Sequence, residues 1–335
     1  MSYLYIEDPN VKTYISDGNI VCENSKENLK NIIPIELIDG VMLVGNTNIS
    51  SGMMKEMLIR EIPVTFLSNN GGYYGRLEST KFTNVERQRN QFKISEDEKF
   101  KLEFAIKIIS AKINNQIVIL RRYNRYLIND IVSKNIKDIE INSKNLNCCQ
   151  SINQVMGIEG ICARKYFESL ALLVNKDFKF NGRNRNPPKD EFNSLLSFGY
   201  TLLLYEIYTI ITTKGLNPYV GLMHKDRNGH PSLASDLMEE WRAIVVDSLN
   251  MYLINSGSIT INEFEKSYNN GIIISKEAVK KYIKRFNQKM LTKSSYLDYV
   301  DEKIDYRRAL ELQVGCLIRS IELNNIDLYN PIRLR

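Results

Sequence analysis

The chain contains only two histidines, His224 and His230, and both lie in the segment GLMHKDRNGHPSLASDLMEEWR. The proline and serine after the second histidine are typical of the first turn of a helix, so a polar turn should lead into a helix here. On that helix Asp236 and Glu239 stand three residues apart, which places their carboxylates on one face. A histidine folded against this face would combine imidazole with carboxylate oxygens, a donor set that suits Mg²⁺ or Mn²⁺. The alternative is a polar core histidine beside a solvated acidic face.

A further acid stands between two glycines in a predicted helix over residues 151–174. Glu159 is flanked by Gly157 and Gly160, and each glycine costs about 1 kcal/mol in a helix interior relative to alanine. Open space around the carboxylate would compensate for this cost. The alternative is close helix packing at small residues, with Glu159 as an ordinary solvated acid.

Other catalytic signatures are absent from the sequence. It has no Walker lysine loop, no G-x-G-x-x-G, no G-x-S-x-G and no H-E-x-x-H motif. Nucleotide hydrolysis, dinucleotide redox chemistry, serine hydrolysis and zinc proteolysis are therefore disfavoured. The 5 cysteines form no C-x-x-C pair, so neither a disulfide frame nor a zinc site is predicted. A hard-metal site is the remaining prediction.

Positive charge is concentrated after the first 75 residues. Residues 1–75 hold 5 basic and 9 acidic side chains, whereas residues 76–125 hold 12 and 6. Basic side chains with aromatic residues between them suit a surface that follows a nucleic-acid strand, and a loop with glycine and paired arginines suits phosphate. The candidate DNA-binding residues are Arg87, Arg89, Arg121, Arg122 and Arg125, with Arg183 and Arg185 in the loop. A solvated helix face and a solvated linker are the alternatives.

The elements that must position these residues fall into two groups. In the first 80 residues, turn signals separate short β segments, which predicts a meander of hairpins with one helix near residues 53–60. The strands are expected at residues 3–7, 11–15, 20–23, 32–38, 41–44, 64–67 and 73–77. From about residue 95 the apolar period changes to three and four residues, which predicts long helices. Strands followed by helices favour an α+β fold. We expect a β-rich domain over residues 1–80, a linker over 81–94 and an α-helical metal-binding catalytic domain over 95–335.

Length and composition exclude several protein classes. The chain has 335 residues, of which 43% are hydrophobic and 25% charged, as in folded globular proteins of two domains. The uncharged stretch between Glu191 and Glu206 has only 14 residues, whereas a membrane span needs about 20. The acidic N-terminus lacks the basic and apolar regions of a signal peptide. We expect a cytoplasmic protein without membrane contact.

Four segments resemble one known family, the CRISPR-associated integrases and endonucleases of spacer acquisition. They are GIEGICARKYF around Glu159, FNGRNRNPPKDEFNSLLSFGYTLL from Phe180, the histidine segment described above, and the terminal YNPIRLR. The resemblance covers essentially the whole chain. Two positions depart from the family pattern: His230 stands where arginine is frequent, and Trp241 where phenylalanine is frequent.

The resemblance implies that Glu159, His224 and Glu239 bind Mg²⁺ or Mn²⁺ and form the catalytic site, with Asp236 as a supporting acid. It implies that the β domain builds a homodimer, and that two homodimers assemble around a dimer of the smaller second CRISPR-associated protein. The implied reaction inserts double-stranded prespacer DNA into CRISPR repeat DNA by transesterification at repeat borders. A non-catalytic DNA-binding scaffold and a generic metal-dependent nuclease are the alternatives.

Overall fold

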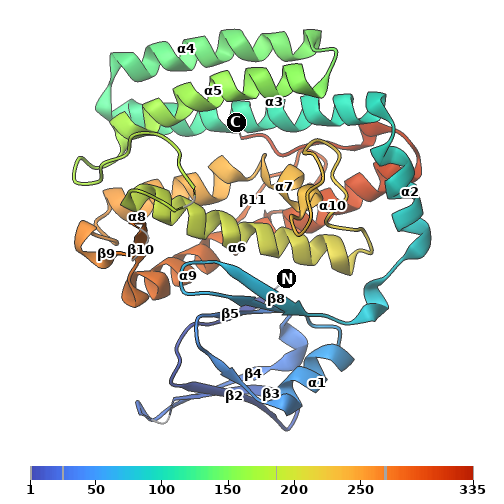
Figure 1. Cartoon of the computed structure of the whole chain (residues 1–335), viewed down its shortest axis with the longest axis vertical. Coiled ribbons are helices and arrows are strands. Elements are labelled where there is room, and N and C mark those ends of the chain that lie inside the picture. The colour runs from blue at the N-terminus through green and yellow to red at the C-terminus, as the bar shows by residue number, and fades with distance from the viewer. Residues whose placement is uncertain (1, 25, 186, 268–269, 335) are drawn as a thin grey trace.

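The computed structural model describes residues 2–334 except 25, 186, 268 and 269. It has a β-rich N-terminal part and a larger helical part, so the expected α+β class is confirmed (Figure 1). The N-terminal elements are β1 (Tyr3–Ile6), β2 (Val11–Ser16), β3 (Asn19–Asn24), β4 (Leu29–Pro34), β5 (Gly40–Val44), β6 (Asn48–Ile49), α1 (Ser51–Ile59), β7 (Val64–Leu67) and β8 (Tyr73–Leu77).

These strands form two sheets rather than one meander. One sheet has the order β4-β3-β2-β6, and the other has the order β1-β5-β7-β8. The expected antiparallel meander is confirmed for β2, β3 and β4, but it is wrong for β1, which pairs in parallel with β5. The turn after β1 carries the chain across to the other sheet, so consecutive strands are not neighbours here.

Strand β5 joins the two hydrophobic cores of the molecule. Val41 and Leu43 point into the core between the two sheets, whereas Met42 and Val44 belong to the core shared with the helices. Side chains alternate between the two faces of a strand, so a strand covered on both faces needs an unbroken apolar run. The sequence GVMLV of β5 meets this need, and all five residues are buried.

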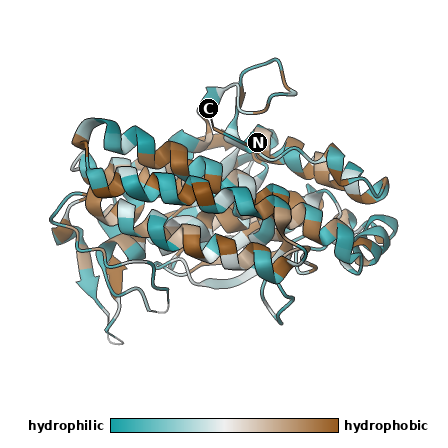
Figure 2. Ribbon diagram, turned by 90° about the horizontal axis from the view of Figure 1, so that it is seen from above, coloured by the Kyte–Doolittle hydropathy of each residue, from teal (hydrophilic) through white to brown (hydrophobic). Residues whose placement is uncertain are grey.

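The described residues of the helical part form nine α-helices, α2 to α10, one π-helical segment and two short antiparallel strand pairs. The elements are α2 (Val85–Ser95), α3 (Glu98–Leu127), α4 (Asp130–Lys144), α5 (Ile152–Leu173), α6 (Glu191–Thr213), α7 (Ser232–Met238), the π-helical segment Arg242–Asp247, α8 (Ser248–Asn255), β9 (Phe264–Lys266), β10 (Ile272–Ile274), α9 (Lys276–Met290), β11 (Lys293–Ser294), β12 (Ile304–Asp305) and α10 (Tyr306–Glu322). Short 3₁₀ turns occur at Ile35–Leu37, Thr80–Phe82, Asn145–Cys148, Ile261–Glu263 and Ile326–Leu328. Helices α3, α4 and α5 form an outer layer (Figure 1), and hydrophobic and hydrophilic residues alternate around the helices (Figure 2).

The stretch 81–94, which we expected to be a linker, contains most of helix α2. This helix packs against α10. Its Gln91 side chain is buried and donates to the carbonyl oxygens of Asn217 and Val220. The connection between the two parts is therefore an ordered helix anchored to the helical domain.

Helix α6 lies at the centre of the helical part. It is long and apolar enough to cross a membrane, but 83% of its most apolar window is buried inside the protein. Such burial is typical of the core helix of a folded domain. Its face toward the β domain carries Glu206, which binds Arg307 of α10 through two hydrogen bonds of 2.7 and 3.0 Å.

The helix predicted after the second histidine is shorter than expected. Helix α7 ends at Met238, and the chain continues through a turn into the π-helical segment. The apolar residues Leu233, Leu237, Trp241 and Ile244, which recur at helical spacing, are all buried. Their burial does not require one continuous helix, because the turn after α7 redirects the chain while keeping these side chains in the core.

Candidate functional site

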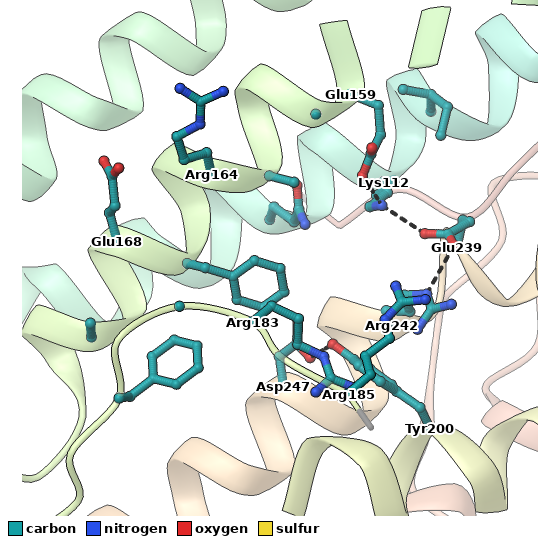
Figure 3. Close-up of a pocket in the computed structure, with 18 of the residues that line it drawn as sticks. Lys112, Glu159, Arg164, Glu168, Arg183, Arg185, Tyr200, Glu239, Arg242 and Asp247 are labelled. Atoms are coloured by element: carbon teal, nitrogen blue, oxygen red, sulfur yellow. Dashed lines mark hydrogen bonds and ion pairs between the residues drawn. The ribbon is translucent and has the colours of Figure 1, made fainter. Parts of the chain in front are cut away.

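One cavity of about 880 Å³ brings together residues from distant parts of the chain. Helices α3 and α5 form one wall, the loop at residues 180–185 forms another, and the segments around α7 and the π-helical segment form the floor (Figure 3). Glu159, His224 and Glu239 all line this cavity. The three residues implied as metal ligands, which span 80 positions of the sequence, therefore face one common space.

A lysine joins the two glutamates in this cavity. Lys112 of α3 places its Nζ 2.5 Å from Oε1 of Glu159 and 2.7 Å from Oε2 of Glu239 (Figure 3). The Nε of Arg242 lies 3.1 Å from the other carboxylate oxygen of Glu239. Burial alone would raise the pKa of Glu239, but Arg242 and Lys112 outweigh it and lower this pKa to about 2. Glu239 is therefore a carboxylate at neutral pH.

The histidine is held by the acid expected to support the site. Nδ1 of His224 lies 2.6 Å from Oδ1 of Asp236, which is fully buried. The carboxylate of Asp236 also accepts backbone N–H groups from Leu222, Met223 and His224 at 2.7 to 2.9 Å. Burial opposes protonation of His224, but the bond to Asp236 outweighs it and raises the pKa of the imidazole. Asp236 thus shapes the loop and leaves Nε2 of His224 for a ligand.

The glycines beside Glu159 do not mediate close helix packing. A Cβ atom added at Gly157 or Gly160 would have no neighbour within 4 Å. Gly160 lines the cavity with Glu159. The open-space explanation for this glycine pair therefore agrees with the structure, and the packing explanation does not.

The donor set of the cavity fits a hard divalent cation. It offers two carboxylates and one imidazole nitrogen, and Oε2 of Glu239 is buried with the Lys112 ammonium 2.7 Å away. A cationic group, the ammonium of Lys112, already bridges the two carboxylates. Within residues 2–334, leaving aside the four undescribed positions, no three His, Cys, Asp or Glu side chains stand close enough together to enclose an ion. The carboxylates are thus arranged around a lysine in this structure.

The candidate DNA-binding arginines do not form one surface. Arg183 and Arg185 line the cavity, whereas Arg87 binds Glu322 and Arg121 binds Glu140. Helix α3 has 30 residues and is about 45 Å long. Arg87 and Arg89 belong to α2, which precedes the first residue of α3. Arg121, Arg122 and Arg125 lie near the last turn of α3. The two groups are therefore at opposite ends of α3.

Several polar residues of the cavity were not predicted from the sequence, among them Lys112, Tyr200, Arg242 and Asp247. A signal exists for Lys112. The buried face of α3 includes Ala105 and Ile109, and Lys112 follows at helical spacing on the same face. A lysine in an apolar stripe requires a buried partner, which identifies it as a candidate.

Comparisons with known proteins identify the family of this chain. A family model described as CRISPR associated protein Cas1 matches residues 4–288. A CRISPR-associated endonuclease Cas1 of Mycobacterium tuberculosis is 32% identical over 323 residues, which cover 96% of this chain and 94% of the relative.

Two solved structures share the fold. A casposase bound to integration product has a TM-score of 0.83 and 22% identity, covering 97% of this chain and 92% of that one. A chain from a Cas6-RT-Cas1--Cas2 complex has a TM-score of 0.82 and 24% identity, covering 100% of this chain and 36% of that one. The structural likeness extends over both the β-rich and the helical part. The family match and the identity to a curated relative over nearly the whole length show that this chain belongs to the CRISPR-associated Cas1 family.

Proposed function

We propose that this protein is a divalent-metal-dependent DNA endonuclease and integrase that inserts prespacer DNA into a CRISPR array. The observation that carries the proposal is the meeting of Glu159, His224 and Glu239 at one cavity that also holds several arginines. Family membership and the endonuclease name of the curated relative support it. The fold shared with a casposase bound to integration product agrees with strand transfer rather than hydrolysis alone.

The metal ligands in this proposal are the carboxylates of Glu159 and Glu239 and Nε2 of His224. A bound Mg²⁺ or Mn²⁺ ion would polarise the target phosphodiester and lower the pKa of the attacking hydroxyl. Asp236 fixes the imidazole orientation through Nδ1. Lys112 holds the two glutamates side by side, so little rearrangement of these carboxylates is needed for a cation to bind.

The proposed reaction is an exchange of phosphodiester bonds. The 3′-hydroxyl of the prespacer strand attacks the phosphorus atom at a repeat border, and one new P–O bond forms. The P–O bond to the repeat strand breaks, and the departing oxygen takes up a proton as a 3′-hydroxyl. The number of phosphodiester bonds is unchanged, so neither a covalent enzyme intermediate nor a nucleotide cofactor is required. Water in place of the 3′-hydroxyl would give nicking by the same site.

The proposed assembly is a homodimer that works with the smaller second CRISPR-associated protein. A solved complex described as Cas6-RT-Cas1--Cas2 contains a chain with this fold, which supports the second partner. The β domain is the proposed dimerisation surface, as the family resemblance implies, and the catalytic cavity lies in the helical part.

A strand-joining assay tests the proposal. Labelled prespacer DNA and a supercoiled plasmid with a CRISPR repeat are incubated with the protein, its purified partner and Mg²⁺ or Mn²⁺, with EDTA as a control. We expect metal-dependent transfer of label to the plasmid that is lost in Glu159→Gln. Nicking without transfer would support the nuclease alternative. DNA binding with neither reaction would support the scaffold alternative.

A further inference from the structure

Two arginines in the cavity converge on one tyrosine. The guanidinium of Arg242 lies 4.5 Å from the centre of the Tyr200 ring, and that of Arg183 lies 5.4 Å from it. The hydroxyl of Tyr200 donates to Asp247 at 2.5 Å, and Tyr166 donates to the other oxygen of Asp247 at 2.7 Å. The ring on which both cations rest is therefore fixed by a buried carboxylate (Figure 3).

The π-helical segment brings Arg242 and Asp247 to the same ring. In an α-helix, residues five apart point about 140° away from each other. A π turn bonds residue i to residue i+5, so residues five apart lie nearer to one side. Arg242 and Asp247 are the first and last residues of this segment, and both contact Tyr200. The π-helical segment thus places Arg242 and Asp247 beside the same Tyr200 ring at the cavity.

Arg183 has polar partners but no acidic one. Its guanidinium donates to the carbonyl oxygen of Asn184, to Oδ1 of Asn193 at 2.9 Å and to Oγ of Ser197 at 3.1 Å, and all three acceptors are neutral. Its Nε is buried and has no hydrogen-bond partner. No ion pair of Arg183 occurs among the residues that the structure describes. A partly buried cation without a directly bonded acidic partner is costly, and an anionic ligand would reduce this cost.

Arg242 complements Arg183 because its outer nitrogens remain available. Its Nε faces the carboxylate of Glu239, one of the proposed metal ligands. In the described part of the chain, neither Nη group of Arg242 has a hydrogen-bond acceptor. Planar guanidinium groups bind phosphate oxygens with directed, charge-assisted hydrogen bonds. Two such groups fixed beside a metal-ligand carboxylate suit one DNA phosphate.

We propose that Arg183 and Arg242 form a clamp that binds the non-bridging oxygens of the DNA phosphate attacked at this site, with Tyr200 and Asp247 as positioning residues. The proposal rests on the proposed DNA-joining function and names the residues that hold its reacting group. Arg183 comes from a loop that could equally have been a solvated linker. In the clamp, Arg183 binds one particular phosphate and does not merely attract DNA by its charge.

The test combines a protein change with removal of a single DNA charge. A branched DNA that mimics the joined prespacer and repeat is made with its junction phosphate either natural or replaced by a neutral methylphosphonate. Its Kd is measured by fluorescence anisotropy in EDTA, where no strand transfer can occur. The proteins are the wild type, Arg183→Gln, Arg183→Lys and the control Arg185→Gln, which removes the same charge from an exposed position on the same loop.

We expect Arg183→Gln to weaken binding of natural DNA about 10- to 100-fold and to leave binding of methylphosphonate DNA nearly unchanged. Arg185→Gln should weaken both DNAs by the same factor, and Arg183→Lys should fall between the wild type and Arg183→Gln. Equal weakening of both DNAs by Arg183→Gln would overturn the clamp. If Arg183→Gln does not fold, the same comparison with Arg183→Lys decides the question. Failure of the wild type to bind either DNA would instead count against the proposed function.

Discussion

At the scale of single residues, Lys112 lies between Glu159 and Glu239, where the proposed metal ion would bind. Its Nζ contacts both carboxylates at 2.5 and 2.7 Å. Burial lowers the pKa of Lys112, but the two glutamates outweigh this effect and raise it. The ammonium therefore stays charged and neutralises a pair of acids that would otherwise repel each other. Any ion that binds the two glutamates has to compete with this contact.

We predict that Lys112→Met makes the fold depend more strongly on divalent metal. Without metal, the variant should lose about 3–5 kcal/mol of stability, because two buried carboxylates lose their shared cation. Added Mg²⁺ or Mn²⁺ should restore more stability to the variant than to the wild type, since no lysine competes for the carboxylates. Thermal melts with and without metal measure this difference. The control is Lys165→Met, which breaks the pair with Asp138 away from the cavity. Equal metal-induced shifts in all three proteins would contradict the prediction.

The raised pKa of Asp247 predicts that the free energy of unfolding depends on pH. Burial raises its pKa from 3.8 to about 6, although Tyr200 and Tyr166 partly oppose this effect. Because the folded state holds the proton more tightly, the resulting stabilisation is fully present below pH about 4 and is lost as the pH rises through about 6. The loss amounts to about 3 kcal/mol for two pKa units.

Asp247→Asn mimics the protonated acid and should remove this decline. Unfolding by urea at several pH values between 4 and 7 measures the free energy of unfolding of both proteins. The difference between them should grow in favour of the variant as the pH rises. A constant difference would mean that Asp247 does not change its protonation on unfolding in this range.

At the scale of elements, the close packing of α6 against its neighbours depends on the small residue Gly199. A Cβ atom at Gly199 would lie 2.1 Å from the hydroxyl oxygen of Tyr282 and 2.6 Å from a methyl carbon of Val246. Val246 belongs to the π-helical segment, and Tyr282 belongs to α9. Gly199 therefore allows α6 to approach the segment that carries Arg242 and Asp247.

We predict that Gly199→Ala destabilises the protein by about 1–3 kcal/mol or more, because the core must shift to accept the methyl group. Gly315→Ala in α10 is the matched control, since a Cβ there meets nothing within 4 Å. It should stabilise the protein by about 0.5–1 kcal/mol through helix propensity. Denaturant titrations of the two variants should therefore shift in opposite directions, and a shared direction would show that the spacing around α6 is not limiting.

At the scale of the whole molecule, the β domain is joined to the helical part by a buried polar cluster. Glu206 of α6 binds Arg307 of α10, and the hydroxyl of Tyr5 in β1 donates to the same carboxylate. The Arg307 guanidinium lies 4.9 Å from the centre of the Tyr3 ring. Residues from both parts therefore share one ion pair, which ties the orientation of the first strand to the helical core.

We predict that Arg307→Met costs about 3–5 kcal/mol, because it leaves the carboxylate of Glu206 buried without its cation. The double variant Arg307→Met with Glu206→Gln should recover most of the loss, since it buries no unpaired charge. Urea unfolding of the wild type, both single variants and the double variant gives the coupling free energy. Additive losses would mean that the two side chains stabilise the molecule independently.

The sequence by itself determined the order of elements and the residues that could do chemistry. Apolar periods and turn residues act over a few neighbouring positions, so most N-terminal strands and the long helices could be located without knowledge of the tertiary structure, but helix α2 and strands β9 to β12 were missed. The four segments that carry the family resemblance also supplied Glu159, His224 and Glu239. Local signals also predicted the antiparallel pairing of β2, β3 and β4, although not the parallel pairing of β1 with β5.

Only the tertiary structure decided which residues meet. The pairing of β1 with β5 and the path after α7 depend on which apolar faces cover each other, and this is not encoded within one segment. The convergence of Lys112 with Glu159 joins residues from two helices, and Arg183 reaches Tyr200 from a separate loop. These contacts arise because buried charges and polar groups must find partners from the elements packed around them. Long-range packing therefore turned a set of candidate residues into one cavity.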